Sequence, residues 1–278
     1  MSNFWQRTLS GFLFVAILTG CIFIHPVCFF VLFFIVNVAA LLEFGRMAER
    51  MGIHINLPMC LLCGAVLFSS GFVHTYTGYR GGYILFFLLT FLIPIFELYR
   101  GKKAFGFKNV AFSYYAILYI TLPFTLLTYF SYIVSGYVPY MHSTSWMPEV
   151  IFLPFLLVWI NDTFAYLFGV RFGKHKLFPR VSPKKSWEGA IGGGVMSIAA
   201  GLAVAPYIEG LKIADTAIIS GIVVIFAVYG DLVESMFKRN IEIKDSGNFL
   251  PGHGGILDRF DAIIFTIPAI FVYLEFMY

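Results

Sequence analysis

The sequence has little charge: only 12% of its 278 residues are Asp, Glu, Lys or Arg, while 59% are hydrophobic. Soluble domains carry about 25% charged residues. A chain with half of that charge does not cover a folded core with hydrated surface, which excludes a soluble enzyme and a disordered chain. The mean hydropathy of +0.84 instead indicates a polytopic membrane protein.

Cysteine is also scarce, and its four copies Cys21, Cys28, Cys60 and Cys63 lie in apolar stretches. This pattern excludes a secreted disulfide scaffold. Cys60 and Cys63 form a C-x-x-C pair, but no histidine or second cysteine pair stands nearby to complete a zinc site. We interpret all four as packing or lipid-facing residues. The chain also lacks internal repeats, low-complexity tracts and a soluble domain.

Apolar stretches of the length of a membrane span recur along the whole chain. A transmembrane helix needs about 20 mostly apolar residues. The sequence therefore predicts an all-α polytopic membrane protein with about nine transmembrane helices. The predicted spans are 8–24, 28–44, 57–75, 83–99, 110–134, 148–170, 190–208, 214–230 and 261–278.

Lysine and arginine are distributed unevenly between the connections. Seventeen of them lie in the N-terminal tail and the even-numbered connections, against only Arg80 and Lys212 on the opposite side. Because positive residues concentrate in cytoplasmic loops, we expect a cytoplasmic N-terminus and an external C-terminus. Lys174 and Lys176 we interpret as positive-inside residues alone.

Polar residues divide the chain into two functional halves. Residues 1–147 are expected to form transmembrane helices for packing, with a possible dimer interface. Residues 148–278 are expected to form the catalytic half, because their two cytoplasmic connections gather carboxylates, lysines, arginines, glycines and a histidine. The predicted active site therefore faces the cytoplasm.

Two polar stretches of this half contain candidate substrate-binding residues. Asp162 lies inside an apolar span, where a carboxylate costs about 2.5–3.5 kcal/mol unless its surroundings are wet or paired. It either lines a functional cavity, which we favour, or pairs with an arginine of a neighbouring helix. The next connection contains Ser182, Lys184, Lys185 and Glu188. Lysine pairs beside a helix start suit lipid headgroups or a nucleotide phosphate, and a plain positive-inside cluster needs neither Ser-Pro nor an acid.

A third cluster begins at the end of span 214–230. Offsets of three, four and seven place Asp231, Glu234, Ser235 and Lys238 on one helical face, and Arg239 follows directly. Such a face presents carboxylates and cations together. The pattern suits a site that binds a metal ion and neutralises a polyphosphate.

A glycine-rich turn precedes the last span. The turn and the helix start contain Gly252, His253, Gly254, Gly255, Asp258, Arg259 and Asp261. Glycines let backbone N–H groups approach phosphates, and a helix start favours anions. Carboxylates about one turn apart suit magnesium, which is usually held by one or two carboxylates plus substrate phosphates. The residues alone therefore favour phosphoryl or nucleotidyl transfer at the cytoplasmic membrane face.

The stretch from Ser235 to Asp261 resembles the signature of the phosphatidate cytidylyltransferase family, also called CDP-diacylglycerol synthases. It reads S-M-F-K-R, four residues, K-D-S-G, and then P-G-H-G-G-I-L-D-R-F-D after three more. The N-D-T-x-A-Y stretch around Asp162 and the S-P-K-K-S-x-E-G loop from Ser182 are also similar to the family pattern. The motifs cover residues 159–261, and the N-terminal half offers a compatible span count.

This resemblance implies the reaction of CTP with phosphatidate to give CDP-diacylglycerol and diphosphate in a bacterial cytoplasmic membrane. It implies a mixed magnesium and potassium site around Asp231 and Asp258, with Asp261 and Lys238 as essential positions. The implied partners are CTP, phosphatidate, membrane lipids and a second copy of the chain in a homodimer, without nucleic acid.

The remaining candidate residues receive roles from the same hypothesis. Lys238, Arg239 and Arg259 would balance the phosphate charge, and the 252–255 turn would hold phosphate oxygens. His253 would either donate a proton to the leaving group or orient the turn. Because the acyl chains of the lipid stay in the bilayer, the sequence also predicts a cavity between spans.

Three other classes of protein share some of these features. A CDP-alcohol phosphotransferase should show D-G-x-x-A-R followed by aspartates four residues apart, whereas Asp258 and Asp261 are three apart. A transporter would bind an anion near the membrane midplane with broken helices, and Asp162 alone favours that class. A cytidylyltransferase for another lipid phosphate would share the headgroup chemistry, so the motifs do not distinguish it.

Overall fold

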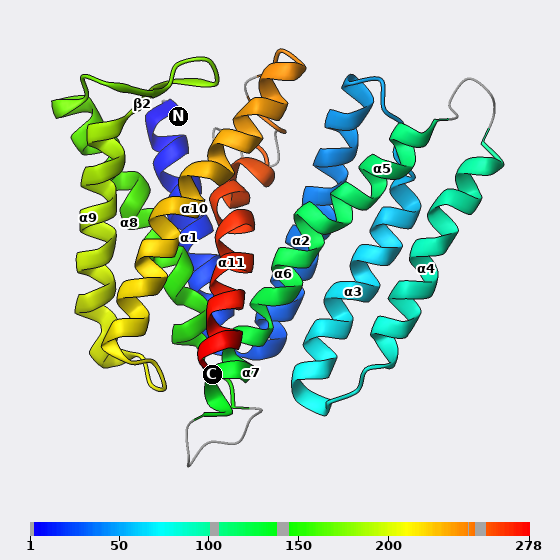
Figure 1. Ribbon diagram of the computed structural model, residues 1–278, viewed down its shortest axis with the longest axis horizontal. Helices are drawn as coiled ribbons and strands as arrows, with labels where there is room; N and C mark the ends of the chain where they lie inside the picture. The colour runs from blue at the N-terminus through cyan, green and yellow to red at the C-terminus, as the bar shows by residue number, and fades with distance from the viewer. Residues whose placement is uncertain (1–2, 101–105, 138–144, 244, 248–253) are drawn as a thin grey trace. The chain divides into compact units, whose positions relative to one another are not determined.

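The computed structural model describes residues 3–100, 106–137, 145–243, 245–247 and 254–278, with the backbone alone for residues 3–8. The described chain is almost entirely helical (Figure 1). Eight of its helical segments are long and apolar enough to span a membrane, and the first helix has a shorter apolar stretch, Leu9–Ile24. The prediction of an all-α polytopic membrane protein is confirmed.

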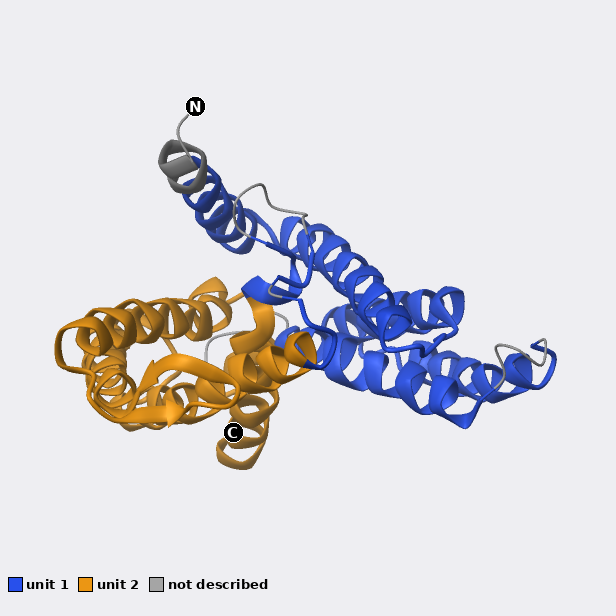
Figure 2. Cartoon of the chain, turned by 90° about the horizontal axis from the view of Figure 1, so that it is seen from above, with its two compact units in different colours: residues 1–129, 240–259 blue, residues 130–239, 260–278 orange. Residues whose placement is uncertain are grey.

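The chain forms two compact units, coloured in Figure 2. Unit 1 comprises residues 1–129 and 240–259, and unit 2 comprises residues 130–239 and 260–278. The motif segment 240–259 thus belongs to the same compact unit as the N-terminal helices. The functional division at residue 147 stays a prediction, because it concerns chemistry and not compactness.

Unit 1 is built from successive apolar helices. Its elements are α1 (Asn3–Ile24), α2 (Pro26–Arg50), α3 (Leu57–Thr77), α4 (Gly81–Leu98), α5 (Phe107–Ala116), the π-helical segment η1 (Ile117–Thr121) and α6 (Leu122–Leu127). Polar caps define the breaks: the Nδ1 of His25 accepts the N–H of Val27 at 3.2 Å, and Asn56 caps α3. Gly78 ends α3 with φ +69°, a left-handed conformation that glycine adopts without strain.

The core of unit 1 is apolar with a few paired polar groups. Its central residues are Met59, Cys63, Leu67, Ile93, Val110 and Ile117. Cys60 and Cys63 are free thiols and are fully buried, which confirms that they pack in the core. The hydroxyl of Thr121 donates to the side-chain oxygen of Asn37 at 2.8 Å, so the buried oxygen of this amide has a partner.

Unit 2 combines four long helices with one small hairpin. Its elements are α8 (Pro148–Phe172), β1 (Lys176–Phe178), β2 (Ser182–Ser186), α9 (Trp187–Val204), the 3₁₀ turn η2 (Ala205–Tyr207), α10 (Ile213–Asn240) and α11 (Leu257–Met277), whose first three residues belong to unit 1. The short helix α7 (Tyr129–Ser135) leads into this unit. The connection expected to be a loop instead forms antiparallel strands, with Phe178 opposite Ser182.

Glycines bring the helices of unit 2 into close contact. A Cβ atom on Gly193 of α9 would lie 2.5 Å from the carbonyl oxygen of Asn161 in α8. A Cβ atom on Gly230 of α10 would lie 2.4 Å from the carbonyl oxygen of Asp261 in α11. Small residues allow such backbone approach between membrane helices. The second contact brings the backbone next to Asp231 against Asp261, within unit 2.

Candidate active site

Asp231 of α10 is the centre of a charged cluster in unit 2. One of its carboxylate oxygens forms an ion pair with the Nζ of Lys185 at 2.5 Å. The other accepts a hydrogen bond from the hydroxyl of Ser235 at 3.1 Å. The Lys185 side chain is 28% exposed and that of Asp231 is 37% exposed, so this pair remains accessible to a ligand. The structure thus joins the second and third sequence motifs.

Two further aspartates lie within electrostatic reach of this pair. Asp162 interacts electrostatically with Lys185 and Asp231, and Asp261 interacts with Asp231, Asp162 and Lys238. Asp261 is half-buried, and one of its oxygens accepts its neighbour Ala262 N–H at 2.7 Å. Asp162, Asp231 and Asp261 therefore form one group of interacting carboxylates, and Lys185 interacts with the first two of them. Mutual repulsion of the carboxylates favours the binding of a cation among them.

Lys238 has a buried partner. Its Nζ lies 2.8 Å from a carboxylate oxygen of Glu234, one helical turn away, and the two residues are 9% and 1% exposed. The ion pair offsets the cost of burying each charge. Lys238 therefore has a structural role in unit 2, and its predicted role in catalysis stays a prediction.

Glu188 holds the β-hairpin to the start of α9. Its carboxylate accepts the N–H of Lys174 at 3.1 Å and of His175 at 3.2 Å, and it lies 2.6 Å from the Nδ1 of His175. The hydroxyl of Ser186 accepts the N–H of Gly189 at 3.2 Å and caps the same helix. These bonds fix the strand that carries Lys185.

The segment around Asp258 belongs to unit 1. One oxygen of Asp258 accepts hydrogen bonds from the N–H of Ser246 at 2.8 Å, the hydroxyl of Ser246 at 3.0 Å and the N–H of Gly255 at 2.8 Å. Gly254 has φ +82°, and a Cβ there would lie 2.6 Å from this same carboxylate oxygen. The N–H of Gly255 therefore donates to Asp258 in this structure. The expected hydrogen bond from this N–H to a substrate phosphate stays a prediction.

The other predicted site residues differ in their exposure. Arg239, Arg259 and Lys184 are exposed, and Ser182 is half-buried in β2. Gly252 and His253 lie outside the described residues, so their expected contacts with phosphate stay predictions.

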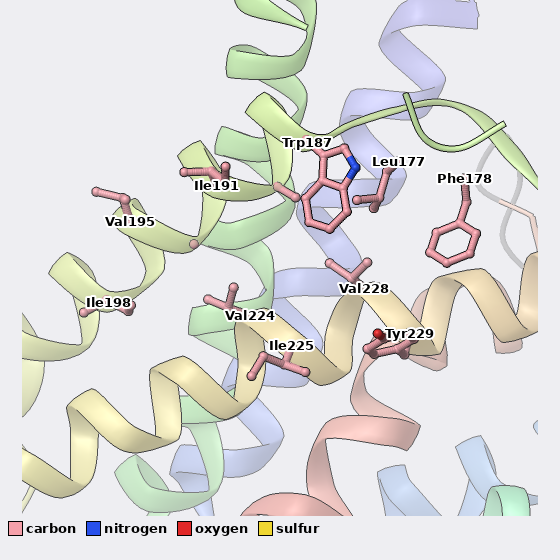
Figure 3. Close-up of a pocket in the computed structure, with 12 residues that line it drawn as sticks. Leu177, Phe178, Trp187, Ile191, Val195, Ile198, Val224, Ile225, Val228 and Tyr229 are labelled. Carbon is pink, nitrogen blue, oxygen red and sulfur yellow. The ribbon is translucent and has the colours of Figure 1, made fainter. Parts of the chain in front are cut away.

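An apolar groove of about 400 Å³ lies between α9 and α10 (Figure 3). Leu177 and Phe178 of β1 and Trp187 of α9 line one end of it, together with Val228 and Tyr229 of α10. Trp187 follows Lys185 by two residues, and Tyr229 precedes Asp231 by two. Residues that line the groove are thus close in the sequence to the charged pair of Lys185 and Asp231. The groove lies between two apolar helices, which is where the sequence predicts a cavity for the lipid.

Carboxylates are the side chains of this cluster that could hold a metal ion. Within the described part of the chain, no three His, Cys, Asp or Glu side chains are arranged to hold a metal ion. Magnesium usually takes one or two carboxylates and completes its shell with substrate phosphates and water. Asp231 and Asp261 in unit 2 supply oxygen donors of this kind, so these residues fit magnesium by their chemistry.

Sequence reasoning missed Glu43 of α2. Its side chain is 4% exposed and accepts the N–H of Ile256 at 2.9 Å and the N–H of Leu257 at 3.0 Å. Both donors stand immediately before Asp258. A signal was present, because Glu43 is an acid within an apolar span, as Asp162 is.

Comparisons with known proteins identify the family of this chain. A sequence model of the cytidylyltransferase family matches residues 5–277. The chain belongs to this family. Membership confirms the resemblance that rests on the Ser235–Asp261 signature.

Three curated relatives of the chain are each named phosphatidate cytidylyltransferase. The chain is 38% identical over 174 residues to that of Staphylococcus haemolyticus (strain JCSC1435) and 39% identical over 176 residues to that of Staphylococcus aureus (strain COL). It is 39% identical over 174 residues to that of Staphylococcus saprophyticus. Each alignment covers 62% of this chain and 62% of the relative, so the matched part spans less than two thirds of these relatives.

Proposed function

We propose that the protein transfers the cytidylyl group of CTP to phosphatidate, giving CDP-diacylglycerol and diphosphate. The observation that carries this proposal is the Lys185–Asp231 ion pair, which lies among the carboxylates of Asp162 and Asp261 and close along the chain to an apolar groove. A lipid phosphate requires this combination of charge and apolar surface. The names of the curated relatives support the same reaction.

The proposed reaction depends more on positioning of the substrates than on acid–base catalysis. An oxygen of the phosphatidate phosphate forms a bond to the α-phosphorus of CTP, while the bond to the bridging oxygen breaks and diphosphate leaves. The nucleophile is already an anion, so it needs no strong general base. The obstacle is the repulsion between two polyanionic substrates, which positioning and charge neutralisation reduce.

Each charged residue of unit 2 has a role in this scheme. Lys185 binds a substrate phosphate once it separates from Asp231, and Asp162 keeps the lysine oriented by electrostatic attraction. Ser235 holds the carboxylate of Asp231 by its hydrogen bond. Arg239 is exposed and meets the departing diphosphate. These residues act together to hold the two phosphates in line.

Magnesium is the proposed cofactor, with Asp231 and Asp261 as its ligands in unit 2. When bound, magnesium neutralises charge that develops on the phosphate oxygens. The accompanying potassium ion and the participation of Asp258, both implied by the family resemblance, stay predictions. Asp258 belongs to unit 1.

The groove between α9 and α10 is proposed to hold an acyl chain of the lipid. Its lining is almost wholly apolar, and it has the volume of a small-ligand pocket. The phosphate end of such a lipid would reach Lys185, which precedes Trp187 in the chain. The lysine and arginine bias assigns this end of unit 2 to the cytoplasmic side, where CTP is available.

Diphosphate release by the purified protein in detergent tests the proposal. We expect release only when CTP, long-chain phosphatidate and magnesium are all present, and a higher KM for short-chain phosphatidate. Matched reactions contain UTP in place of CTP, or an isoprenoid lipid phosphate in place of phosphatidate. Release with the isoprenoid lipid alone would transfer the assignment to another lipid phosphate, and release without any lipid would contradict the proposal.

A further inference from the structure

Glu43 is a carboxylate in the interior of unit 1, on the helix α2. With 4% of its surface exposed, it has little access to water. A buried carboxylate is costly unless hydrogen-bond donors replace its hydration. The described structure supplies three donors, and all three come from residues more than 200 positions later in the chain.

These donors come from two segments that are separated in the sequence by residues 248–253. The N–H groups of Ile256, just before α11, and of Leu257, its first residue, donate at 2.9 Å and 3.0 Å. The hydroxyl of Ser246, at 3.2 Å, comes from the segment before the turn. Glu43 therefore binds both Ser246 and the start of α11 to one point on α2.

Ser246 connects Glu43 directly to Asp258. Its hydroxyl lies 3.2 Å from Glu43 and 3.0 Å from Asp258, while its N–H donates to Asp258 at 2.8 Å. One hydroxyl hydrogen serves both carboxylates, so movement of Glu43 changes the donors that hold Asp258. The two acids form one hydrogen-bonded unit.

Two glycines of the signature make this approach possible. A Cβ atom on Gly247 would lie 2.5 Å from one oxygen of Glu43, and a Cβ atom on Gly255 would lie 2.4 Å from the other. Any larger residue at either position would collide with the carboxylate. Gly247 and Gly255 are thus explained by packing against Glu43, without a phosphate.

We infer that Glu43 is a positioning residue, which anchors Ser246 and the two residues immediately before Asp258 and thereby fixes the orientation of that carboxylate. A negative group at the start of a helix is stabilised by the unpaired N–H groups and the helix dipole. Here the group comes from a different helix, so it also sets where α11 begins. The catalytic consequence rests on the proposed function, because it requires Asp258 to act in cytidylyl transfer.

Glu43→Gln tests the inference in the full-length protein in detergent. The amide keeps the shape of the side chain but turns one acceptor into a donor that faces the N–H groups of α11. We expect hydrogen exchange in peptides containing Ser246 and residues 254–258 to accelerate about tenfold, because charge-assisted hydrogen bonds are lost. We also expect the magnesium concentration for half-maximal activity to rise about tenfold, with little change in the KM for CTP.

Glu97→Gln is the matched control. Glu97 is also 4% exposed and also in unit 1, but it accepts bonds from Gly106 and Asn109 and pairs with Arg100. We expect it to leave exchange around Asp258 and the magnesium dependence at their wild-type values. In Glu43→Asp, the shorter acid should restore part of the exchange protection.

Two results would overturn the inference: wild-type exchange around Asp258 in Glu43→Gln, or equal acceleration in every region of both variants. The exchange experiment does not need the proposed reaction. A wild-type protein without transferase activity would therefore contradict the proposed function, while the exchange result would still decide whether Glu43 anchors the segment.

Discussion

At the scale of single residues, the proposed function depends on the contact between Lys185 and Asp231. The sequence predicts both as site residues, but it does not predict that they pair, because they are 46 positions apart on different elements. Their contact depends on the hairpin β1–β2, whose pairing is set by backbone hydrogen bonds. A charge pattern identifies candidates, whereas tertiary packing selects partners among them.

Lys185→Met should lower kcat/KM about 100-fold, since loss of one group that stabilises the transition-state charge typically has this effect. Lys176→Met is the control, because Lys176 is exposed in the same hairpin and is interpreted as a positive-inside residue. Steady-state rates of diphosphate release measure both variants. Equal losses in the two variants would assign the effect to the net charge of the hairpin.

The buried pair of Glu234 and Lys238 allows structure and catalysis to be separated. Removing one partner leaves a buried charge unpaired and should cost roughly 3–5 kcal/mol of stability. We therefore expect Lys238→Met to unfold at a lower temperature in detergent, and the double variant Glu234→Gln, Lys238→Met to recover part of that loss. Activity that returns together with stability would contradict a catalytic role for Lys238.

Glu43 is a residue of the candidate site that the sequence analysis did not identify. The sequence assigns residues 1–147 to packing, although Glu43 is an acid within an apolar span. The cost argument that identifies Asp162 applies equally to it. Only the fold reveals that its donors lie at Ser246, Ile256 and Leu257.

At the scale of elements, the predicted spans agree with the helices to within a few residues at most ends. Long apolar runs dictate helices, because every backbone polar group must be satisfied within the bilayer. The hairpin and the π-helical segment Ile117–Thr121 were not predicted. Both depend on packing between elements, which hydropathy does not report.

Gly230→Ala should disturb the approach of α10 to α11. The added methyl would lie 2.4 Å from the carbonyl oxygen of Asp261. Because this oxygen belongs to the backbone, it cannot move away as a flexible side chain would. We expect a loss of about 1–3 kcal/mol in stability and a fall in activity, because Asp231 is displaced from Asp261. Thermal unfolding and diphosphate release report the two effects.

Gly221→Ala on the same helix is the control. Among the described residues, no atom outside the adjoining backbone of α10 lies within 4 Å of the added Cβ, and alanine favours a helix over glycine. Stability should stay equal or rise, with unchanged activity. If Gly230→Ala also keeps its stability and activity, the close contact between α10 and α11 is not required for either.

At the scale of the whole molecule, composition was sufficient to predict an integral membrane protein, and the signature was sufficient to predict the family. Neither predicts the two compact units, because the grouping of residues 240–259 with the N-terminal helices depends on contacts distant in sequence. The homodimer implied by the resemblance stays a prediction, as does the orientation of the termini.

Cysteine accessibility tests the predicted orientation. Single cysteines replace Lys176 in β1 and Glu209, which is exposed in the connection between α9 and α10. In intact cells, an impermeant maleimide should label only the variant at residue 209, and opened membranes should allow labelling of both. The wild-type protein provides the baseline for Cys21, Cys28, Cys60 and Cys63. Labelling of residue 176 in intact cells would reverse the orientation.

The measurement that tests the central claim most directly is the fate of labelled CTP in the purified protein with phosphatidate and magnesium. Label at the α-phosphate should appear in a lipid product, and label at the γ-phosphate should appear only in diphosphate. Asp231→Asn should abolish both, because the variant removes the charge that holds Lys185 and the proposed metal. Lipid labelled from the γ-phosphate, or transfer that proceeds normally in Asp231→Asn, would contradict the account.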